Sequence, residues 1–214
     1  MAQKISGWRS VLSFPGIYRL SQNILGCSSS RYEFVKIYIR PKPSMRILDI
    51  GCGPASILKY LPEDINYVGV DLSSEYIQAA KERYGHRGQF YCLAVESIPE
   101  KFLGQFDLVM GLSVLHHLDD DQARSFFSMA AKAITQNDKG RCLTVDPCFV
   151  AGQHPIARIL IRMDRGQNVR TAAEYSTLAK TAFSHVTHAI RHDRLRVPYT
   201  HHIMECRQQQ ELRK

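Results

Sequence analysis

The chain has 214 residues, of which 44% are hydrophobic, and a formal net charge of +8. This length suits a single domain with one hydrophobic core. No stretch approaches the roughly 18 uninterrupted apolar residues of a membrane-spanning helix, and the first residues lack an apolar signal core, so we expect no membrane insertion and a cytoplasmic protein.

The positive charge raises the question of a nucleic-acid partner, because clustered Lys and Arg residues release counterions from phosphate. The clearest cluster is Arg158, Arg162 and Arg165, whose spacing places them on one face of a helix. The opposite face of that helix carries the apolar residues Ile156, Ile159, Leu160 and Met163. A solvated helix face is favoured over an acidic-substrate site, and nucleic acid is not favoured as a partner.

The first 42 residues predict a helical extension that precedes the first strand. Apolar residues between positions 7 and 39 fall into two or three helical pieces. Pro41 and Pro43 then indicate an extended approach to the first strand.

From residue 43 onward, strands alternate with helices, which predicts an α/β fold with a doubly wound, mostly parallel sheet. The seven predicted strands cover residues 46–50, 67–71, 89–93, 107–111, 142–146, 185–190 and 200–206. Ligands bind such sheets at the carboxyl ends of the strands, where the strand order reverses. The residues that this edge gathers are Asp49, Asp71, Val95, Gly111 and Asp146.

Helix caps support these boundaries. Ser73 or Ser74 can cap the helix after Asp71, and the aspartates 119–121 can cap the next one. Thr171 and Glu174 have the spacing of a capping box. The three aspartates are therefore interpreted as caps rather than as metal ligands.

A glycine turn is the most informative motif. The apolar run at 46–50 contains Asp49 and leads into Gly51 and Gly53, which permit unusual backbone dihedrals and a close ligand approach. Twenty residues after Gly51, a second apolar run ends on Asp71, which can accept hydrogen bonds from ribose hydroxyls. The two acids predict a site for a nucleoside-containing cofactor.

Dinucleotide binding is disfavoured at this turn. The dinucleotide fingerprint requires a third glycine where this chain has Ser56, and Pro54 stiffens the turn before it. Asp49 would repel a nearby pyrophosphate but would attract the ammonium of a cofactor that carries an amino acid. A hydride-transferring dehydrogenase therefore remains only as an alternative.

Four segments together resemble the class I S-adenosylmethionine-dependent methyltransferases, particularly the small-molecule branch that includes quinone-biosynthesis enzymes. They are residues 47–55, 68–73, 106–118 and 140–145. The resemblance covers roughly residues 45–146 and implies S-adenosylmethionine as cofactor, a Rossmann-like methyltransferase fold and an antiparallel final strand. We divide the single domain 1–214 into an N-terminal helical lid (1–42), a cofactor-binding core (43–146), and a substrate-side insertion with the final strands (147–214).

The family pattern implies that Phe14 or Tyr18 of the lid can cover the cofactor, although core packing is favoured for either. Family members commonly place an acid after the third strand to bind the adenine amino group, and Ala94 stands at that position. Glu96 is a candidate replacement; otherwise backbone groups near Val95 hold the adenine. The predicted cofactor-binding residues are Asp49, Gly51, Cys52, Gly53, Asp71, Leu72, Val95, Glu96 and Gly111.

Methyl transfer requires no enzyme nucleophile, but a hydroxyl acceptor needs a base to take its proton. The candidate bases are His116, His117, Asp146, His154, Tyr199 and His202. We select His154, because it lies in the predicted insertion beside the pocket and because histidine titrates near neutral pH. His188 and His192 are not expected to share a face of a strand, so no metal site is predicted.

The sequence thus predicts a methyltransferase for a small-molecule acceptor, with oxygen favoured over nitrogen or carbon. Methylation of nucleic-acid bases is disfavoured, because residues 111–114 read Gly-Leu-Ser-Val where such enzymes have an Asn-Pro-Pro-aromatic or Asp-Pro-Pro-aromatic motif. The alternatives are a noncatalytic methyltransferase-like binding module and an RNA methyltransferase. The sequence does not define the oligomeric state.

Overall fold

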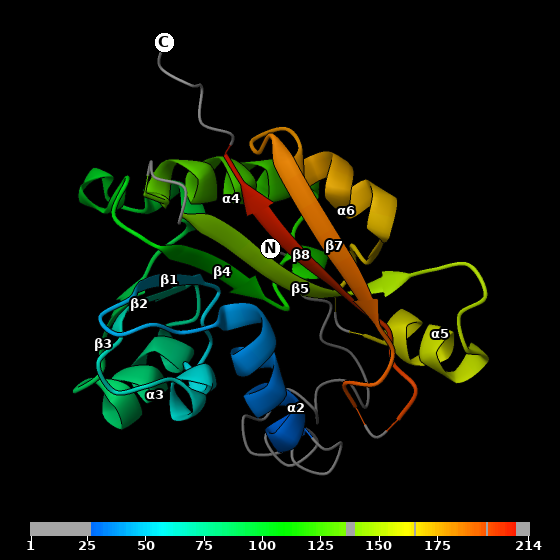
Figure 1. The fold of residues 1–214 in the computed structure, drawn as a ribbon, viewed down its shortest axis with the longest axis horizontal. Helices are drawn as coiled ribbons and strands as arrows, with labels where there is room; N and C mark the ends of the chain where they lie inside the picture. Colours follow the sequence, from blue (N-terminus) through cyan, green and yellow to red (C-terminus); the bar gives the residue numbers. More distant parts are fainter. Residues whose placement is uncertain (1–26, 136–139, 165, 196, 209–214) are drawn as a thin grey trace.

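The computed structural model describes residues 27–135, 140–164, 166–195 and 197–208. Its centre is a mixed sheet with the strand order β3-β2-β1-β4-β5-β8-β7, and β6 pairs with β5 off this path (Figure 1). The strands are β1 (Arg46–Ile50), β2 (Asn66–Asp71), β3 (Gly88–Cys92), β4 (Leu108–Leu112), β5 (Arg141–Phe149), β6 (Arg170–Thr171), β7 (His185–Arg191) and β8 (His201–Arg207). All seven predicted strands are confirmed.

The sheet has the expected mixture of strand directions. Strands β1 to β5 pair in parallel, whereas β8 is antiparallel to both β5 and β7, as the family resemblance implied. Strand β5 is longer than predicted, because Pro147 still pairs with His201 of β8. The two-residue strand β6, beside the end of β5, was not predicted.

Helices cover both faces of the sheet, as in a doubly wound fold. The helices are α2 (Cys27–Phe34), α3 (Ser74–Tyr84), α4 (Asp120–Ala133), α5 (Pro155–Arg162) and α6 (Ala172–Ala179), and the shorter turns are η2 (Val35–Ile39), η3 (Ser56–Tyr60), η4 (Val95–Ser97), η5 (Glu100–Phe102) and η6 (Leu115–His117). One core lies under α4 and α6, and the other lies under α2 and α3 (Figure 1). Within the described segments, no helix has both the length and the apolar content to cross a membrane.

The helix starts follow the predicted caps. The Ser73 hydroxyl accepts a hydrogen bond from the Tyr76 N–H at 3.2 Å. Asp119 begins α4 with a capping box, and Thr171 begins α6 with the predicted one. The aspartates before α4 therefore stabilise a helix end, as the sequence indicated.

The helical segment before β1 is fastened to the sheet by Arg141. This side chain is buried, donates to the Tyr38 carbonyl at 3.0 Å and also donates to the Ile39 carbonyl. Its guanidinium lies 3.3 Å from Glu205 of β8. The end of η2 is thus tied to β5 and β8, while Phe14 and Tyr18 of the predicted lid lie outside the described residues.

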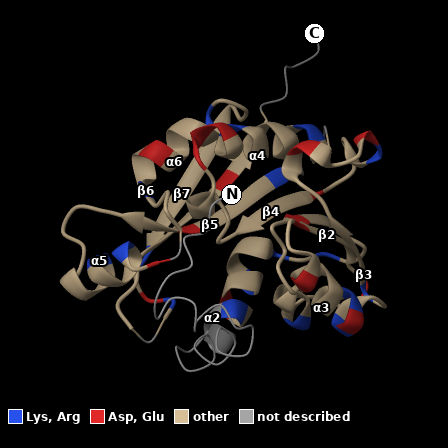
Figure 2. Ribbon diagram, turned by 180° about the vertical axis from the view of Figure 1, so that it is seen from behind, with Lys and Arg blue, Asp and Glu red and all other residues tan. Residues whose placement is uncertain are grey.

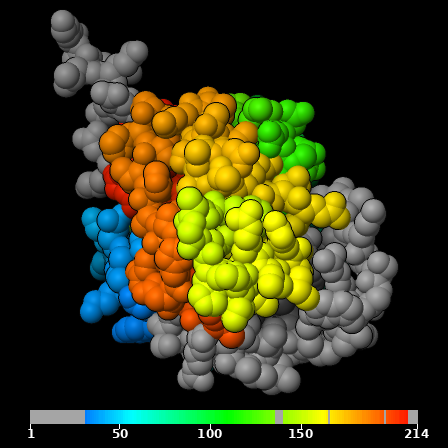
Figure 3. Space-filling view, turned by 90° about the vertical axis from the view of Figure 1, so that its right-hand side faces the viewer, coloured from blue at the N-terminus to red at the C-terminus, as the bar shows by residue number. Residues whose placement is uncertain are grey.

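Helix α5 corrects the predicted orientation of its apolar face. Ile156 and Ile159 are 51% and 55% exposed, and Met163 is also exposed. The buried residues are Ala157 and Ile161, so the face that packs inward lies more than about a third of a turn around the helix from the predicted one. Figure 3 shows α5 (yellow) on the surface beside the end of the sheet.

Candidate functional site

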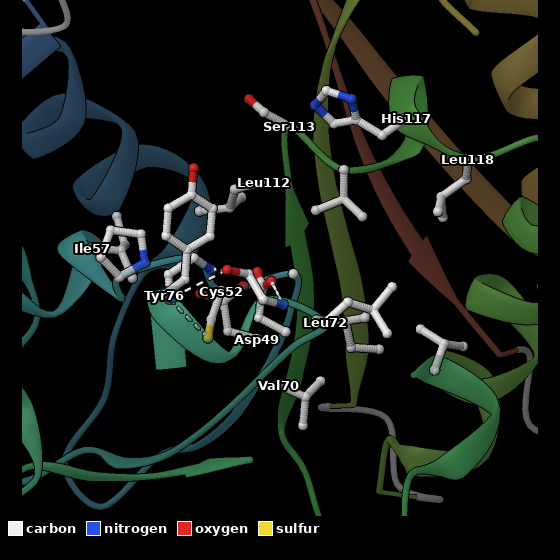
Figure 4. A pocket seen from close by; sticks show the side chains of 18 of the residues that line it. Asp49, Cys52, Ile57, Val70, Leu72, Tyr76, Leu112, Ser113, His117 and Leu118 are labelled. Carbon is white, nitrogen blue, oxygen red and sulfur yellow. Dashed lines mark hydrogen bonds between the residues drawn. The ribbon is translucent and has the colours of Figure 1, made fainter. Parts of the chain in front are cut away.

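A cavity of about 600 Å³ opens at the carboxyl ends of β1, β2 and β4. This is the edge at which the strand order reverses, with β1 between β2 and β4. Figure 4 shows the cavity with Asp49 and Cys52 near its centre. The structure brings eight of the nine predicted cofactor residues into its wall: Asp49, Gly51, Cys52, Gly53, Asp71, Leu72, Val95 and Glu96.

Asp49 is the most unusual residue in this wall, because its carboxylate is only 2% exposed. The Tyr67 hydroxyl donates to Oδ2 at 2.5 Å, while the buried Oδ1 has no hydrogen-bond partner in the described part of the chain. Burial raises the pKa of Asp49 to about 7; the Tyr67 hydrogen bond opposes this rise and the charge of Asp71 adds to it. A buried acid with one unsatisfied oxygen fits a ligand ammonium.

The two glycines of the turn between β1 and η3 are needed for different reasons. Gly51 has φ of +75°, and a Cβ at this position would lie 2.5 Å from Val114 Cγ2. Gly53 has φ of +53°, but a Cβ there would meet no described atom within 4 Å. Gly51 thus allows the turn to pack, while Gly53 leaves open space for the close approach of a ligand.

Asp71 is held in a fixed orientation by the backbone around it. Its Oδ2 accepts a hydrogen bond from the Gly53 N–H at 2.8 Å, and its Oδ1 accepts one from the Ser73 N–H at 2.9 Å. Each carboxylate oxygen retains a second acceptor position, which suits a pair of ribose hydroxyls. The adjacent Leu72 is 50% exposed within the wall and offers an apolar surface to a base.

The chain after β3 lines the next part of the cavity. Ala94, Val95 and Glu96 all lie in the wall, at the start of η4. Ala94 offers no side-chain acceptor for an adenine amino group, whereas the exposed Glu96 reaches the same wall. The two candidates for contacting the adenine amino group are the Glu96 carboxylate and the backbone near Val95. Both residues line this cavity.

Gly111 is the one predicted cofactor residue that does not line the cavity. It is buried, and a Cβ at this position would lie 2.6 Å from the ring of Phe126 on α4. Side chains alternate between the two faces of a strand, so the next residue, Leu112, points to the cavity instead. The predicted residue was one position away from the one that the structure places there.

The predicted base His154 lies outside this cavity. It is exposed at the start of α5, where its Nδ1 accepts a hydrogen bond from the Ile156 N–H at 3.2 Å. Of the six candidate bases, all within the described segments, only His117 lines the cavity. Figure 4 shows His117 and Ser113 on the side of the cavity away from Val70.

His116 is instead part of a buried charge network. Its Nδ1 lies 2.8 Å from Asp146 Oδ1, and its Nε2 lies 3.4 Å from Asp164 Oδ1. The Tyr199 hydroxyl donates to Asp164 Oδ2 at 2.8 Å. Although burial opposes protonation, the two carboxylates raise the pKa of His116 to about 9, and the histidine holds the pKa of Asp164 below its usual value. This network links the loop after β4 to β5 and to the segment before β8.

The remaining candidate, His202, is also buried. Its ring stacks on Tyr175 with the ring centroids 5.7 Å apart, and burial lowers the pKa of His202 to about 4. The ring centroid of His188 lies 5.2 Å from that of His202. His192 instead lies beyond β7 and contacts Thr200. The described part of the chain contains no group of three His, Cys, Asp or Glu side chains placed to hold a metal ion.

The part of the cavity around Ser113 and His117, here called its far end, was not predicted from the sequence. Ser113 lies there in the left-handed backbone region, with φ of +62°, and its N–H donates to the Val145 carbonyl at 2.7 Å. Strained backbone of this kind often occurs at functional sites. Arg31 of α2 and Arg194 of the β7–β8 connection also line the cavity, and in the strand order β8 and β7 lie beyond β5, away from β2 and β3. No sequence motif marks either arginine.

Comparison with known proteins shows similarity to methyltransferases. Residues 47–137 match the family model described as "Methyltransferase domain". A ubiquinone biosynthesis O-methyltransferase from Idiomarina loihiensis is 28% identical over 98 residues, which is 44% of this chain and 40% of that protein. A phosphoethanolamine N-methyltransferase from Triticum aestivum is 26% identical over 188 residues, which is 85% of this chain and 35% of that protein. The chain thus spans well under half the length of these curated relatives.

The fold is shared with solved methyltransferase structures. Phosphoethanolamine N-methyltransferase 2 from Haemonchus contortus, in complex with S-adenosyl-L-methionine, superposes with a TM-score of 0.72 at 15% identity. The match covers 98% of this chain and 62% of that one. At this identity the likeness establishes the Rossmann-like methyltransferase fold.

Proposed function

We propose that the chain is a class I S-adenosylmethionine-dependent methyltransferase, which binds S-adenosylmethionine in the cavity and transfers the methyl group to a small molecule. The match of residues 47–137 to a methyltransferase domain supports this proposal. The observation that carries this proposal is the buried Asp49 carboxylate, whose unsatisfied Oδ1 lies beside a glycine turn. Burying an acid without a full set of partners is costly, and a ligand ammonium would offset that cost.

The other wall residues have complementary roles in this proposal. Gly51 and Gly53 make room for the methionine portion, with Cys52 between them. Asp71 binds the ribose hydroxyls, Leu72 contacts the adenine, and Val95 or Glu96 contacts its amino group. When bound, the cofactor supplies an electrophilic methyl group on a sulfonium. The protein's contribution is to position the acceptor and exclude water, which is worth up to roughly 7–11 kcal/mol in favourable cases.

The acceptor is proposed to be a small molecule methylated at oxygen. A cavity of about 600 Å³ must hold both reactants, which favours a compact acceptor. One of the two curated relatives is named for ubiquinone biosynthesis and the other for phosphoethanolamine, which supports a small-molecule acceptor, and the first also supports the quinone-biosynthesis-like branch. His117 is proposed as the group that takes the hydroxyl proton, because it lines the cavity and histidine titrates near neutral pH.

A matched pair of histidine variants tests the assignment of the base. His117→Ala is expected to lower the methyl-transfer rate by roughly 10²- to 10⁴-fold, the usual contribution of a positioned base, while His154→Ala retains the wild-type rate. Affinity for S-adenosylhomocysteine should be unchanged in both variants. The acceptor is first identified by mass spectrometry after incubation of the protein with cell extract and S-adenosylmethionine carrying a deuterated methyl group. A rate loss confined to His154→Ala would return the role to His154.

The same incubation separates the alternative functions. Deuterium in a small metabolite supports the proposal, whereas deuterium in RNA identifies an RNA methyltransferase. Tight cofactor binding with no deuterium transferred to any component identifies a noncatalytic binding module.

A further inference from the structure

We propose that the acceptor carries an anionic group, a carboxylate or a phosphate, and that Arg31 and Arg194 bind this group at the far end of the cavity. The inference rests on the proposed function, because it names the acceptor class of the same site. It begins from the two guanidinium-bearing residues that share this wall, although they are 163 positions apart in the sequence.

The charges in the cavity wall are segregated. Its described acidic residues, Asp49, Asp71 and Glu96, all belong to β1, β2 or the chain after β3, which form the proposed cofactor end. Arg31 lies on α2, and Arg194 lies between β7 and β8. Figure 2 shows basic positions on α2 and on the β7–β8 connection at the same end of the molecule. A cationic acceptor would be bound less favourably at this end than an anionic one.

An aromatic ring of the cavity wall lies against Arg194. The guanidinium of Arg194 lies 4.6 Å from the ring centroid of Phe34, a cation–π contact. Phe34 is 3% exposed and also lines the cavity. Arg31 is three residues before Phe34 on α2, so the two side chains share one helix face. Arg194 thus contacts the ring of a residue that lies on the same helix face as Arg31.

Arg191, the last residue of β7, contacts α2 and η2 and so holds this helical segment beside the β7–β8 connection. Its Nη2 lies 3.4 Å from Glu33 Oε1, and its Nη1 donates to the Tyr38 hydroxyl at 3.3 Å. Arg191 also forms two hydrogen bonds to Asp193, at 2.7 and 2.9 Å. Arg191 therefore connects Glu33 and Tyr38, on either side of Phe34 in sequence, to the chain that leads from β7 to Arg194.

The chemistry of the wall narrows the acceptor further. Guanidinium groups bind carboxylates and phosphates through paired, parallel hydrogen bonds, so they select planar or tetrahedral oxyanions. Leu112, Val114 and Val145 also line the cavity, at or just after β4 and in β5, two strands that lie between β1 and β8 in the sheet. These side chains suit an apolar or aromatic body, with the acidic group at the end away from the atom that is methylated.

The test compares matched ligands that differ in charge. Calorimetry measures the binding of 3,4-dihydroxybenzoate and 3,4-dihydroxybenzamide to the protein saturated with S-adenosylhomocysteine, and phenyl phosphate and phenol form the phosphate arm. Wild type is expected to bind at least one anion roughly 10- to 100-fold more tightly than its neutral partner, as a charge-assisted hydrogen bond allows. The arm with the larger ratio identifies a carboxylate or a phosphate.

Variants show whether the two arginines produce this preference. Arg31→Gln and Arg194→Gln should each reduce the ratio, and the double variant should abolish it. Arg158→Gln, which removes a cation–π arginine of α5 beside Phe149, should leave the ratio unchanged. Equal binding of anionic and neutral partners by wild type, or a ratio that survives in the double variant, would overturn the inference. Tighter binding of a short single-stranded RNA than of both anions would also overturn it.

A separate titration distinguishes this result from failure of the proposed function. Affinity for S-adenosylhomocysteine should be the same in wild type and in all four arginine variants. Absence of that affinity in wild type would refute the proposed function. The ratio of the affinities for the anionic and the neutral ligand can then be measured on the protein without S-adenosylhomocysteine. The same outcomes support or overturn the assignment of an anion site to Arg31 and Arg194.

Discussion

Replacing Asp49 by asparagine is expected to make the ligand-free protein more stable at pH 8, by roughly 2–4 kcal/mol. Burial raises the pKa of Asp49 from 3.8 to about 7, so at pH 8 the folded chain carries a buried charge that the unfolded chain keeps in water. The stability from this raised pKa is present in full below about pH 3.8 and is lost as the pH rises through about 7. Asparagine keeps an oxygen that accepts from Tyr67 and carries no charge.

Urea denaturation at pH 4 and pH 8 measures this effect. The gain in unfolding free energy should be large at pH 8 and should nearly disappear at pH 4, where Asp49 is protonated in the folded protein. Asp121→Asn is the control, since Asp121 is exposed, and it should give no gain at either pH. A loss of stability in Asp49→Asn at pH 8 would contradict our account of this carboxylate. The same variant should bind S-adenosylhomocysteine poorly, because the charge opposite its ammonium is gone.

His116→Ala is expected to lower the unfolding free energy by about 3–5 kcal/mol, the usual cost of removing one partner of a buried ion pair. The variant leaves the buried Asp146 without its histidine partner and also removes the contact to Asp164. Because the pKa of His116 is raised from 6.5 to about 9, its stabilising effect is complete below about pH 6.5 and is lost as the pH rises through about 9. Urea denaturation of wild type and variant between pH 6 and pH 10 checks both statements.

The exposed His185 provides the matched control for this histidine. His185→Ala should change the unfolding free energy by less than about 0.5 kcal/mol, as exposed substitutions usually do. A similarly small change in His116→Ala, or a wild-type stability that rises between pH 7 and pH 9, would show that the network does not hold a charged histidine.

The fold was predictable because the strands that form its centre are buried on both faces. Such strands appear in sequence as continuous apolar runs, like Ile47–Ile50 and Tyr67–Val70, separated by capped helices. Strand β6 left no such signal, because two residues are too few to form a pattern. The inward face of α5 was also missed, because apolar residues occur on more than one side of that helix and periodicity alone does not decide which side packs.

In the candidate site, too, the sequence indicated some of the residues and missed others. Eight of the nine residues predicted to bind the cofactor line one cavity, because a strand, a glycine turn and a second strand-end acid are close in sequence and need particular residue types. Gly111 does not line the cavity whereas Leu112 does, because neighbouring residues of a strand face opposite sides of the sheet and the sequence did not fix where β4 ends. Arg31, His117 and Arg194 also line the cavity, although they come from three distant segments. Only the tertiary fold brings them together, so local sequence signals favoured His154 instead.

The central claim is that the carboxylates at the ends of β1 and β2 bind the cofactor, and calorimetric titration with S-adenosylhomocysteine tests it most directly. Wild type and Asp121→Ala are expected to bind with equal affinity. Asp71→Ala should bind more weakly by at least roughly 1.5–3 kcal/mol, the contribution of a hydrogen bond to a charged group. Equal affinity of Asp71→Ala and wild type, or no binding by wild type, would contradict the claim.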